Sequence, residues 1–149
     1  MTLSISKTRI FLIGGTSHVG KSTLGKALAD KLGWDCVATD SLGKHPGRPW
    51  TRGKDREIKE HVAQYYRTLS VDALLEDVLS HYQKKILPQV EAIIETHTSV
   101  STNKCLVIEG SALYPKFVGH LLKEKGIRGI WLTANDRLLE DRILYESNF

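Results

Sequence analysis

Two glycines, a lysine and a serine stand at a spacing that can hold phosphate groups. Four residues separate Gly15 from Gly20, and Lys21 and Ser22 follow directly. Glycines let the backbone curl until successive N–H groups point inward, where phosphate oxygens accept their hydrogen bonds. A lysine at this place reaches the outer phosphates of a nucleotide, and a serine hydroxyl takes a place around Mg²⁺. The spacing therefore predicts a phosphate-binding loop with a magnesium ligand at Ser22.

The flanks of this loop suit the Walker A pattern, G-x-x-x-x-G-K-[ST], that it matches. An apolar run with strand character, residues 9–13, precedes it, and apolar residues at helical spacing follow over residues 21–32. The positive end of the helix adds to the field on a bound phosphate. The alternative is a glycine-rich turn that only joins strand to helix, and for His18 it is a side chain facing solvent. The nucleotide-binding residues that we expect are Gly15, Thr16, Ser17, His18, Val19, Gly20, Lys21, Ser22 and Thr23.

Strands alternate with helices along the chain. The apolar patterns predict strands at 9–13, 34–39, 105–108 and 127–133, and helices at 21–32, 55–69, 71–97, 115–125 and 136–146. We expect Gly33 to end the first helix, Pro88 to kink or divide the third, and Asn135 to cap the last. This alternation predicts a three-layer α/β fold with a parallel sheet and right-handed crossovers.

Length and composition limit the classes of protein that remain. A chain of 149 residues suits a single domain, residues 1–149, and 41% hydrophobic with 26% charged residues excludes disordered and collagen-like classes. The longest apolar run, residues 10–13, is too short to cross a bilayer, and no secretory signal precedes it, which predicts a cytoplasmic protein without a membrane partner. The net charge of +4 is spread along the chain, which favours a small anionic partner over nucleic acid. Cys36 and Cys105 are expected to be buried, reduced thiols.

From Arg9 to Arg142 the chain resembles the P-loop small-molecule kinases, a group that includes shikimate, gluconate, nucleoside monophosphate and 2-phosphoglycerate kinases. The stretches that carry the resemblance are residues 11–23, 38–41 and 107–110, and they look most like 2-phosphoglycerate kinase. The resemblance implies a P-loop NTPase fold with sheet order 2-3-1-4-5, ATP and Mg²⁺ as cofactors, and phosphoryl transfer to a small anionic metabolite bearing a hydroxyl or phosphate. Family members continue into a lid and a fifth strand, so here we expect the order 2-3-1-4. The open sheet edge would then favour a homodimer or lower the solubility.

The resemblance also implies roles for two acids. Asp40 occupies the place of an acid that faces the acceptor, where a carboxylate can orient a hydroxyl and take its proton. The alternative for Asp40 is an acid that caps a turn. Glu109 resembles the Walker B acid, which holds a magnesium-bound water or contacts substrate; the alternative is an exposed acid at a strand end. Shikimate kinase has a further acid where this chain has Ala38, which weakens the case for shikimate. Lys21, Asp40 and Glu109 are thus the expected catalytic residues.

Arginines complete the expected site. Arg48, Arg52 and Arg56 belong to a region that covers the acceptor in related kinases. Each arginine alone suits a solvated surface better, but as a set they favour an anionic acceptor. Arg142 resembles an arginine that lies on the adenine ring in adenylate kinases; the alternative is an ion pair with Glu146 within one helix. A second function class also fits the sequence, namely a nucleotide-binding module or slow NTPase without transferase activity.

Overall fold

The computed structural model describes residues 7–43, 45, 60–99 and 104–147. At its centre lies a parallel sheet of four strands in the order β2-β3-β1-β4. The strands are β1 (Ile10–Gly15), β2 (Asp35–Ala38), β3 (Leu106–Glu109) and β4 (Ile127–Leu132). Both neighbours of β1 pair with it in parallel, and β2 pairs in parallel with β3. This is the strand order predicted from the sequence.

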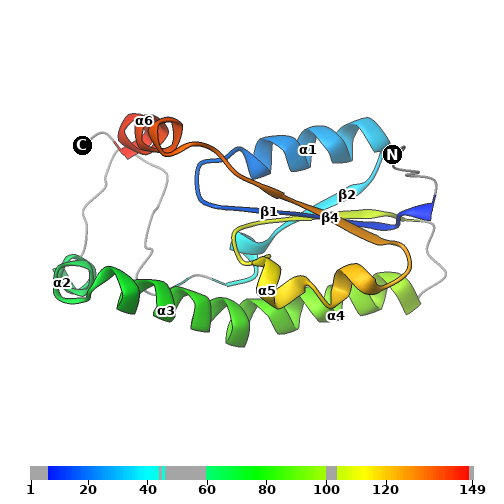
Figure 1. Ribbon diagram of the computed structural model, residues 1–149. Coiled ribbons are helices and arrows are strands. Elements are labelled where there is room, and N and C mark those ends of the chain that lie inside the picture. The colour runs from blue at the N-terminus through cyan, green and yellow to red at the C-terminus, as the bar shows by residue number, and fades with distance from the viewer. Residues whose placement is uncertain (1–6, 44, 46–59, 100–103, 148–149) are drawn as a thin grey trace.

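Helices cover both faces of the sheet (Figure 1). Helix α1 (Lys21–Leu32) lies on one face, and α4 (Leu87–Ser99) and α5 (Pro115–Val118) lie on the other. Successive side chains of β1 alternate between these layers. Ile10 and Leu12 pack into the larger core with residues of α4, whereas Ile13 packs with Ala29 of α1. The three-layer α/β prediction is confirmed, and the cover on both faces explains why the central strand β1 contains no polar side chain.

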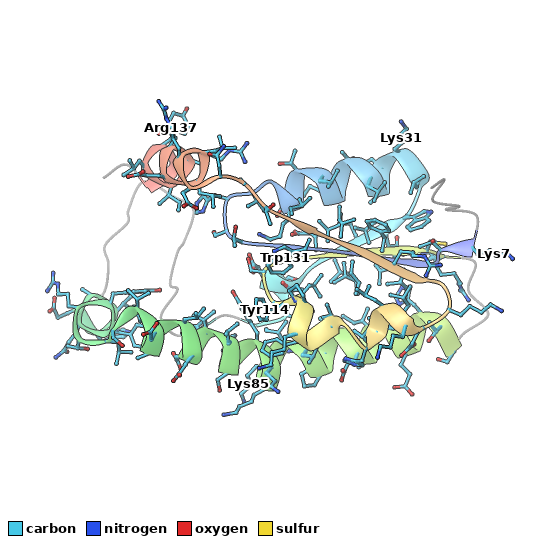
Figure 2. All side chains as sticks on the ribbon, in the orientation of Figure 1. Lys7, Lys31, Lys85, Tyr114, Trp131 and Arg137 are labelled. Atoms are coloured by element: carbon cyan, nitrogen blue, oxygen red, sulfur yellow. The ribbon has the colours of Figure 1, made fainter. Side chains whose placement is uncertain are left out.

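A single long helical rod forms most of the second layer. It consists of α3 (Val71–His81), the π-helical turn η3 (Tyr82–Ile86) and α4, in direct succession. The predicted helix at 71–97 is thus present, and its expected interruption is the wide turn just before Pro88. Proline has no N–H to donate to the carbonyl one turn earlier and its ring crowds that carbonyl, so a widened turn relieves the clash. Lys85 of η3 points away from the sheet (Figure 2).

The caps that were predicted are present. Gly33 follows α1 in the left-handed conformation, with φ 66°. The last helix, α6 (Asp136–Ser147), begins with a hydrogen bond of 2.8 Å from the Leu138 N–H to Asn135 Oδ1. Both local signals therefore act as the sequence indicates.

Other boundaries differ from the prediction. The helix expected at 115–125 is divided into α5 and a 3₁₀ turn, η4 (Leu121–Lys123), because Gly119 between them has low helix propensity. The second strand ends at Ala38, since Thr39 already begins a 3₁₀ turn, η2 (Thr39–Ser41). Helix α2 is described over Glu60–Thr68, and the expected start at residue 55 lies outside the described residues.

The burial predicted for the cysteines is wrong for Cys36. Its side chain is exposed, because β2 lies at the edge of the described sheet and pairs on one side only, whereas Cys105 is half-buried. Both are free thiols, as predicted. Among the described helices, none combines the length and the apolar character that crossing a membrane requires.

Candidate active site

The expected site residues meet where the parallel strands end. In the sheet register, Ile13 of β1 lies opposite Glu109 of β3, and Glu109 lies opposite Ala38 of β2. The phosphate loop, the turn that holds Asp40 and the Glu109 carboxylate therefore leave the sheet at one edge. This is the edge at which open parallel sheets bind ligands.

The phosphate loop owes its curl to residues with positive φ. These are Gly15 at 152°, His18 at 63° and Gly20 at 94°. A Cβ atom on Gly15 would lie 2.7 Å from the Leu132 carbonyl oxygen, so the close approach of β4 requires glycine there. Gly20 directly precedes α1, and its carbonyl accepts a hydrogen bond of 3.0 Å from the Leu24 N–H. The backbone of the predicted motif thus curls at the start of a helix.

Lys21 is held inside this curl. It is the first residue of α1, is only 8% exposed, and its Nζ donates a hydrogen bond of 2.6 Å to the Thr16 carbonyl. The first turn of α1 contains no acidic residue, so the positive field of the helix end is not offset there. Ser22 and Thr23 are exposed in the same turn. Backbone N–H groups, an ammonium group and hydroxyls therefore gather where a phosphate chain would lie.

The two predicted acids differ in environment. Asp40 is exposed in η2. In this turn it is the Ser41 hydroxyl that donates a hydrogen bond of 2.7 Å to the Ala38 carbonyl. Glu109 is 4% exposed and lies against α1, where a Cβ on Gly25 would be 3.1 Å from its Cγ. Burial and the charge of Glu109 together raise the pKa of the nearby Cys36 thiol. The alternative interpretation of Glu109, an exposed acid at a strand end, is therefore wrong.

These side chains line one cleft of about 730 Å³. It lies between the phosphate loop, the first two turns of α1 and the ends of β2 and β3, and α6 contributes one arginine. Its lining residues are Ser17, His18, Val19, Gly20, Lys21, Ser22, Thr23, Leu24, Ala27, Asp40, Glu109, Ser111 and Arg142. Gly15 and Thr16 belong to the loop but are not among the residues that line the cleft. The residues that the sequence placed together are thus brought together, and Ser111 is an addition that follows Glu109 and Gly110 at the same sheet edge.

Arg142 makes a contact that neither sequence interpretation included. One of its guanidinium nitrogens donates a hydrogen bond of 2.8 Å to the His18 carbonyl. This bond joins α6 to the phosphate loop across 124 positions of sequence. The alternative partner, Glu146, has a side chain outside the described residues. The resemblance to adenylate kinases pointed to this residue, but nothing in the sequence indicates its bond to the loop.

The acceptor side of the site is described only in part. Arg48, Arg52 and Arg56 lie outside the described residues. His45, from the same basic segment, is buried and bonds Asp77 of α3 at 3.0 Å instead of lining the cleft. Within the described part of the chain, no group of three His, Cys, Asp or Glu side chains is placed to hold a metal ion. Ser22 and Glu109 nevertheless bring hard oxygen donors to one cleft, which suits Mg²⁺ because this ion takes few protein ligands beside phosphate and water.

Known proteins resemble this chain over different lengths. A shikimate kinase of Nitratidesulfovibrio vulgaris is 59% identical over 34 residues, which are 23% of this chain and 19% of that protein. A protein of Pyrococcus abyssi provisionally named an adenylate kinase is 27% identical over 139 residues, 93% of this chain and 68% of that protein. The chain thus spans about a fifth and about two thirds of these two relatives. No family model matches the chain.

Solved structures were also compared. A gluconokinase from Sinorhizobium meliloti has a TM-score of 0.47 at 17% identity, covering 93% of this chain and 65% of the other. A sugar kinase from a Janibacter species has a TM-score of 0.46 at 19% identity, covering 91% and 66%.

The motif, the fold around it and the sequence matches all point to the same kind of protein. A Walker A loop joins the central strand of a parallel sheet to α1, the strand order is that of the family, and the matched sequences are a shikimate kinase and a protein named for adenylate kinase. Over most of its length the chain is therefore similar to P-loop small-molecule kinases.

Proposed function

We propose that this chain binds Mg-ATP in the cleft and transfers the γ-phosphoryl group to a hydroxyl or phosphate oxygen of a small anionic metabolite. One observation supports this proposal above the others: the phosphate loop, Lys21, Asp40 and Glu109 line a single cleft. A loop that only joined a strand to a helix would need neither a buried lysine nor two carboxylates facing the same space.

The phosphate end of the cleft supplies positive charge. The N–H groups of residues 15–22 and the N-terminus of α1 face the phosphate oxygens, and Lys21 neutralises charge on the outer phosphates. The bond from Lys21 to the Thr16 carbonyl keeps the ammonium group at the loop, so its position is set before ATP enters. Such preorganised charge stabilises the transition state without further rearrangement.

Ser22 and Glu109 would hold magnesium. The Ser22 hydroxyl binds the ion directly, and the buried Glu109 carboxylate accepts a hydrogen bond from a water bound to it. Magnesium held by these residues would supply positive charge against the outer phosphates. Gly25 leaves the room that Glu109 needs beside α1, since any side chain there would crowd the Glu109 Cγ.

Asp40 would act on the acceptor. Its exposed carboxylate accepts a hydrogen bond from the acceptor hydroxyl and directs the oxygen at the γ-phosphorus. A bond forms between that oxygen and phosphorus, and the bond from phosphorus to the bridging oxygen breaks. ADP leaves with the electron pair, and the hydroxyl proton passes to Asp40. For an acceptor that presents a phosphate oxygen, Asp40 has no proton to take and serves only to orient a neighbouring group.

The acceptor is proposed to carry negative charge. The basis is the sequence of the segment after Asp40, where guanidinium groups of Arg48, Arg52 and Arg56 would pair with carboxylate or phosphate. The names of the relatives suggest shikimate, gluconate and AMP as trial acceptors, and the motif resemblance adds 2-phosphoglycerate. Ala38 stands where shikimate kinase has a second acid, so shikimate is the weakest of the four.

Two measurements with the purified chain test the proposal. The first is thermal unfolding with and without Mg-ATP, for the parent, Lys21→Ala and Lys26→Ala. At a hundredfold excess over Kd, ligand binding stabilises by about 2.7 kcal/mol, which raises Tm by roughly 5 to 10 °C for a domain of this size. We expect this rise in the parent and in Lys26→Ala, which changes an exposed lysine of the same helix, and a reduced rise in Lys21→Ala.

The second measurement is product formation from Mg-ATP with the four trial acceptors and a wider panel of anionic metabolites. A phosphorylated product that Lys21→Ala fails to make supports the kinase. Binding of ATP with slow release of phosphate, and no phosphorylated product from any acceptor, would instead support a nucleotide-binding module or slow NTPase.

A further inference from the structure

The segment that follows Asp40 lies along the helical rod of the second layer. Gln89 Nε2 of α4 donates a hydrogen bond of 2.9 Å to the Leu42 carbonyl. A Cβ on Gly43 would lie 3.0 Å from Ile86 Cδ1, and His45 Nε2 lies 3.0 Å from Asp77 Oδ2 of α3. Residues 42, 43 and 45 therefore meet the rod in antiparallel order, with contacts from α4 through η3 to α3.

Asp77 connects three elements at the far end of this segment. Its carboxylate accepts hydrogen bonds from the His45 ring and from the Tyr65 hydroxyl of α2. The His45 side chain is only 6% exposed, whereas Asp77 is 49% exposed, so the histidine is the buried partner. The His45 ring packs edge-on against the His81 ring, with centroids 5.0 Å apart. We call the bonds of Asp77 to His45 and Tyr65, with the bond of Gln89 to Leu42, the rod anchor.

The π-helical turn sets the register of the rod anchor. Twelve residues separate Asp77 from Gln89, and at roughly 100° per residue an uninterrupted α-helix would place them about 120° apart around the axis. A π turn accommodates one extra residue, so the same separation counts as eleven steps and the angle falls to about 20°. Both side chains then face the same side of the rod, and both contact the segment 42–45.

A hydrogen-bonded turn links Asp40 to the segment that the rod anchor holds. Within η2, the Leu42 N–H donates to the Thr39 carbonyl at 3.0 Å, and the Ser41 hydroxyl donates to the Ala38 carbonyl at 2.7 Å. Thr39 is 1% exposed and packs against Gly110. Asp40 thus stands in a short turn that β2 holds on one side and Gln89 holds, through Leu42, on the other.

We propose that Asp77 and Gln89 are positioning residues for the acceptor side of the cleft, holding residues 42–45 on the rod and thereby fixing the Asp40 carboxylate relative to the phosphate loop. This inference rests on the proposed function, because it is the role of Asp40 toward the acceptor that gives the fixation its effect. Neither residue lines the cleft, so both act through the segment and touch no substrate.

The test uses two substitutions of equal size with matched controls on the same rod. Asp77→Asn removes the negative charge that strengthens the hydrogen bonds from His45 and Tyr65, because a neutral amide oxygen is a weaker acceptor than a carboxylate oxygen. Its control is Glu76→Gln, the neighbouring exposed acid. Gln89→Glu removes the donor to the Leu42 carbonyl, and its control is Gln83→Glu in η3. All four positions are exposed or half-exposed, so each variant is expected to fold, and thermal unfolding verifies it.

The first readout is hydrogen exchange in a peptide covering residues 38–43, which needs no acceptor. The weaker acceptor in Asp77→Asn and the lost donor in Gln89→Glu should each speed exchange there by about three- to tenfold. In these two variants, exchange in the phosphate-loop peptide should match the parent. In the two control variants, exchange at residues 38–43 should match the parent as well. If residues 38–43 exchange at the same rate in both variants as in the parent, the rod anchor does not hold this segment, and this conclusion does not depend on the catalytic activity.

The second readout is the kinetics of transfer to whichever acceptor the metabolite panel identifies. The KM for the acceptor should rise about three- to tenfold in both variants, while the KM for Mg-ATP stays unchanged. An equal rise in both KM values would indicate general loosening and overturn the positioning role. If the parent transfers no phosphoryl group, the proposed function fails and the positioning role fails with it, while the exchange data still decide whether the segment is anchored.

Discussion

In the phosphate loop, residues 15–22 follow one another in the chain and act mainly through backbone groups, whereas the rod anchor joins groups from residues up to 47 positions apart. The loop is defined by a local spacing of glycine, lysine and serine. The anchor depends on the placement of α2, α3, α4 and the segment after β2. Nucleotide binding can therefore be encoded in a contiguous motif, while the acceptor side requires that the rest of the fold be correctly placed.

The largest effect should separate chemistry from nucleotide binding. We expect Asp40→Asn to lower kcat for a hydroxyl acceptor by about 10² to 10⁴, because the amide cannot take the proton in the transition state. The rise in Tm that Mg-ATP produces should be unchanged, since the phosphate loop is intact. Asp30→Asn, an exposed acid of α1, is the control and should match the parent in both assays. A kcat within threefold of the parent for Asp40→Asn would show that Asp40 is only a turn residue.

The second prediction tests whether the phosphate loop depends on residues outside its own contiguous motif. Gly110 follows Glu109 with φ 152°, and a Cβ there would overlap the Thr39 side chain at the end of β2. We expect Gly110→Ala to lower the free energy of unfolding by about 2 to 4 kcal/mol in urea titrations, because both overlap and backbone strain oppose the substitution. The loss should come with weaker Mg-ATP binding, because Gly110 N–H also bonds the Ile13 carbonyl just before the loop.

Gly33→Ala is the matched control for that substitution. Gly33 also has positive φ, at 66°, but a Cβ there meets no atom within 4 Å. Its cost should be about 1 kcal/mol, from the left-handed backbone alone. Equal losses in the two variants would mean that the contact between Gly110 and Thr39 is unimportant and that the strand ends are coupled more loosely than the structure indicates.

These contrasts explain how far the sequence could predict the molecule. The phosphate loop and the cap at Asn135 were predictable because each depends on a pattern within a few residues, whereas the strand order was predicted only through the resemblance to P-loop small-molecule kinases. The burial of Glu109 was not, since it depends on Gly25 of α1, which leaves space at a place that no local pattern specifies. The exposure of Cys36 was missed for a related reason: an apolar strand looks the same whether it lies at the centre or at the edge of a sheet.

Side-chain contacts across the fold were beyond prediction altogether. The bonds of Asp77 to His45 and of Arg142 to His18 join residues 32 and 124 positions apart. Pro88 predicted an interruption of the long helix, but not that the interruption would be a π turn that rotates Gln89 toward Leu42. Such contacts depend on the final angles between packed elements, and those angles are set by the whole core.

The third effect asks whether the loop needs support from a distant element. We expect Arg142→Ala to raise the Kd for Mg-ATP about three- to tenfold, because the guanidinium lines the cleft and holds the His18 carbonyl. Calorimetric titration measures the change. Arg137→Ala, on the outer side of α6 (Figure 2), should bind as the parent does. Equal affinity in parent and Arg142→Ala would restore the view that the contiguous motif suffices.

The smallest effect concerns the pH dependence of the rod anchor. Burial, and then the charge of His45, lower the pKa of His81 below its usual 6.5, while Asp77 opposes the shift. Below pH 6.5 the unfolded chain therefore binds a proton at this residue more readily than the folded chain does. The contribution of His81 to the free energy of unfolding is therefore complete above pH 6.5 and is lost as the pH falls toward the lowered pKa.

Thermal unfolding from pH 7.5 to 5.5 measures this contribution. The drop in Tm should be slightly larger for the parent than for His81→Gln, which cannot titrate in this range. Asp77→Asn removes the opposing carboxylate, so in that variant the His81 resonances should titrate at a lower pH than in the parent. An unchanged His81 titration in Asp77→Asn would mean that the carboxylate does not act on this ring, and that the anchor extends no further along α3 than its own hydrogen bonds.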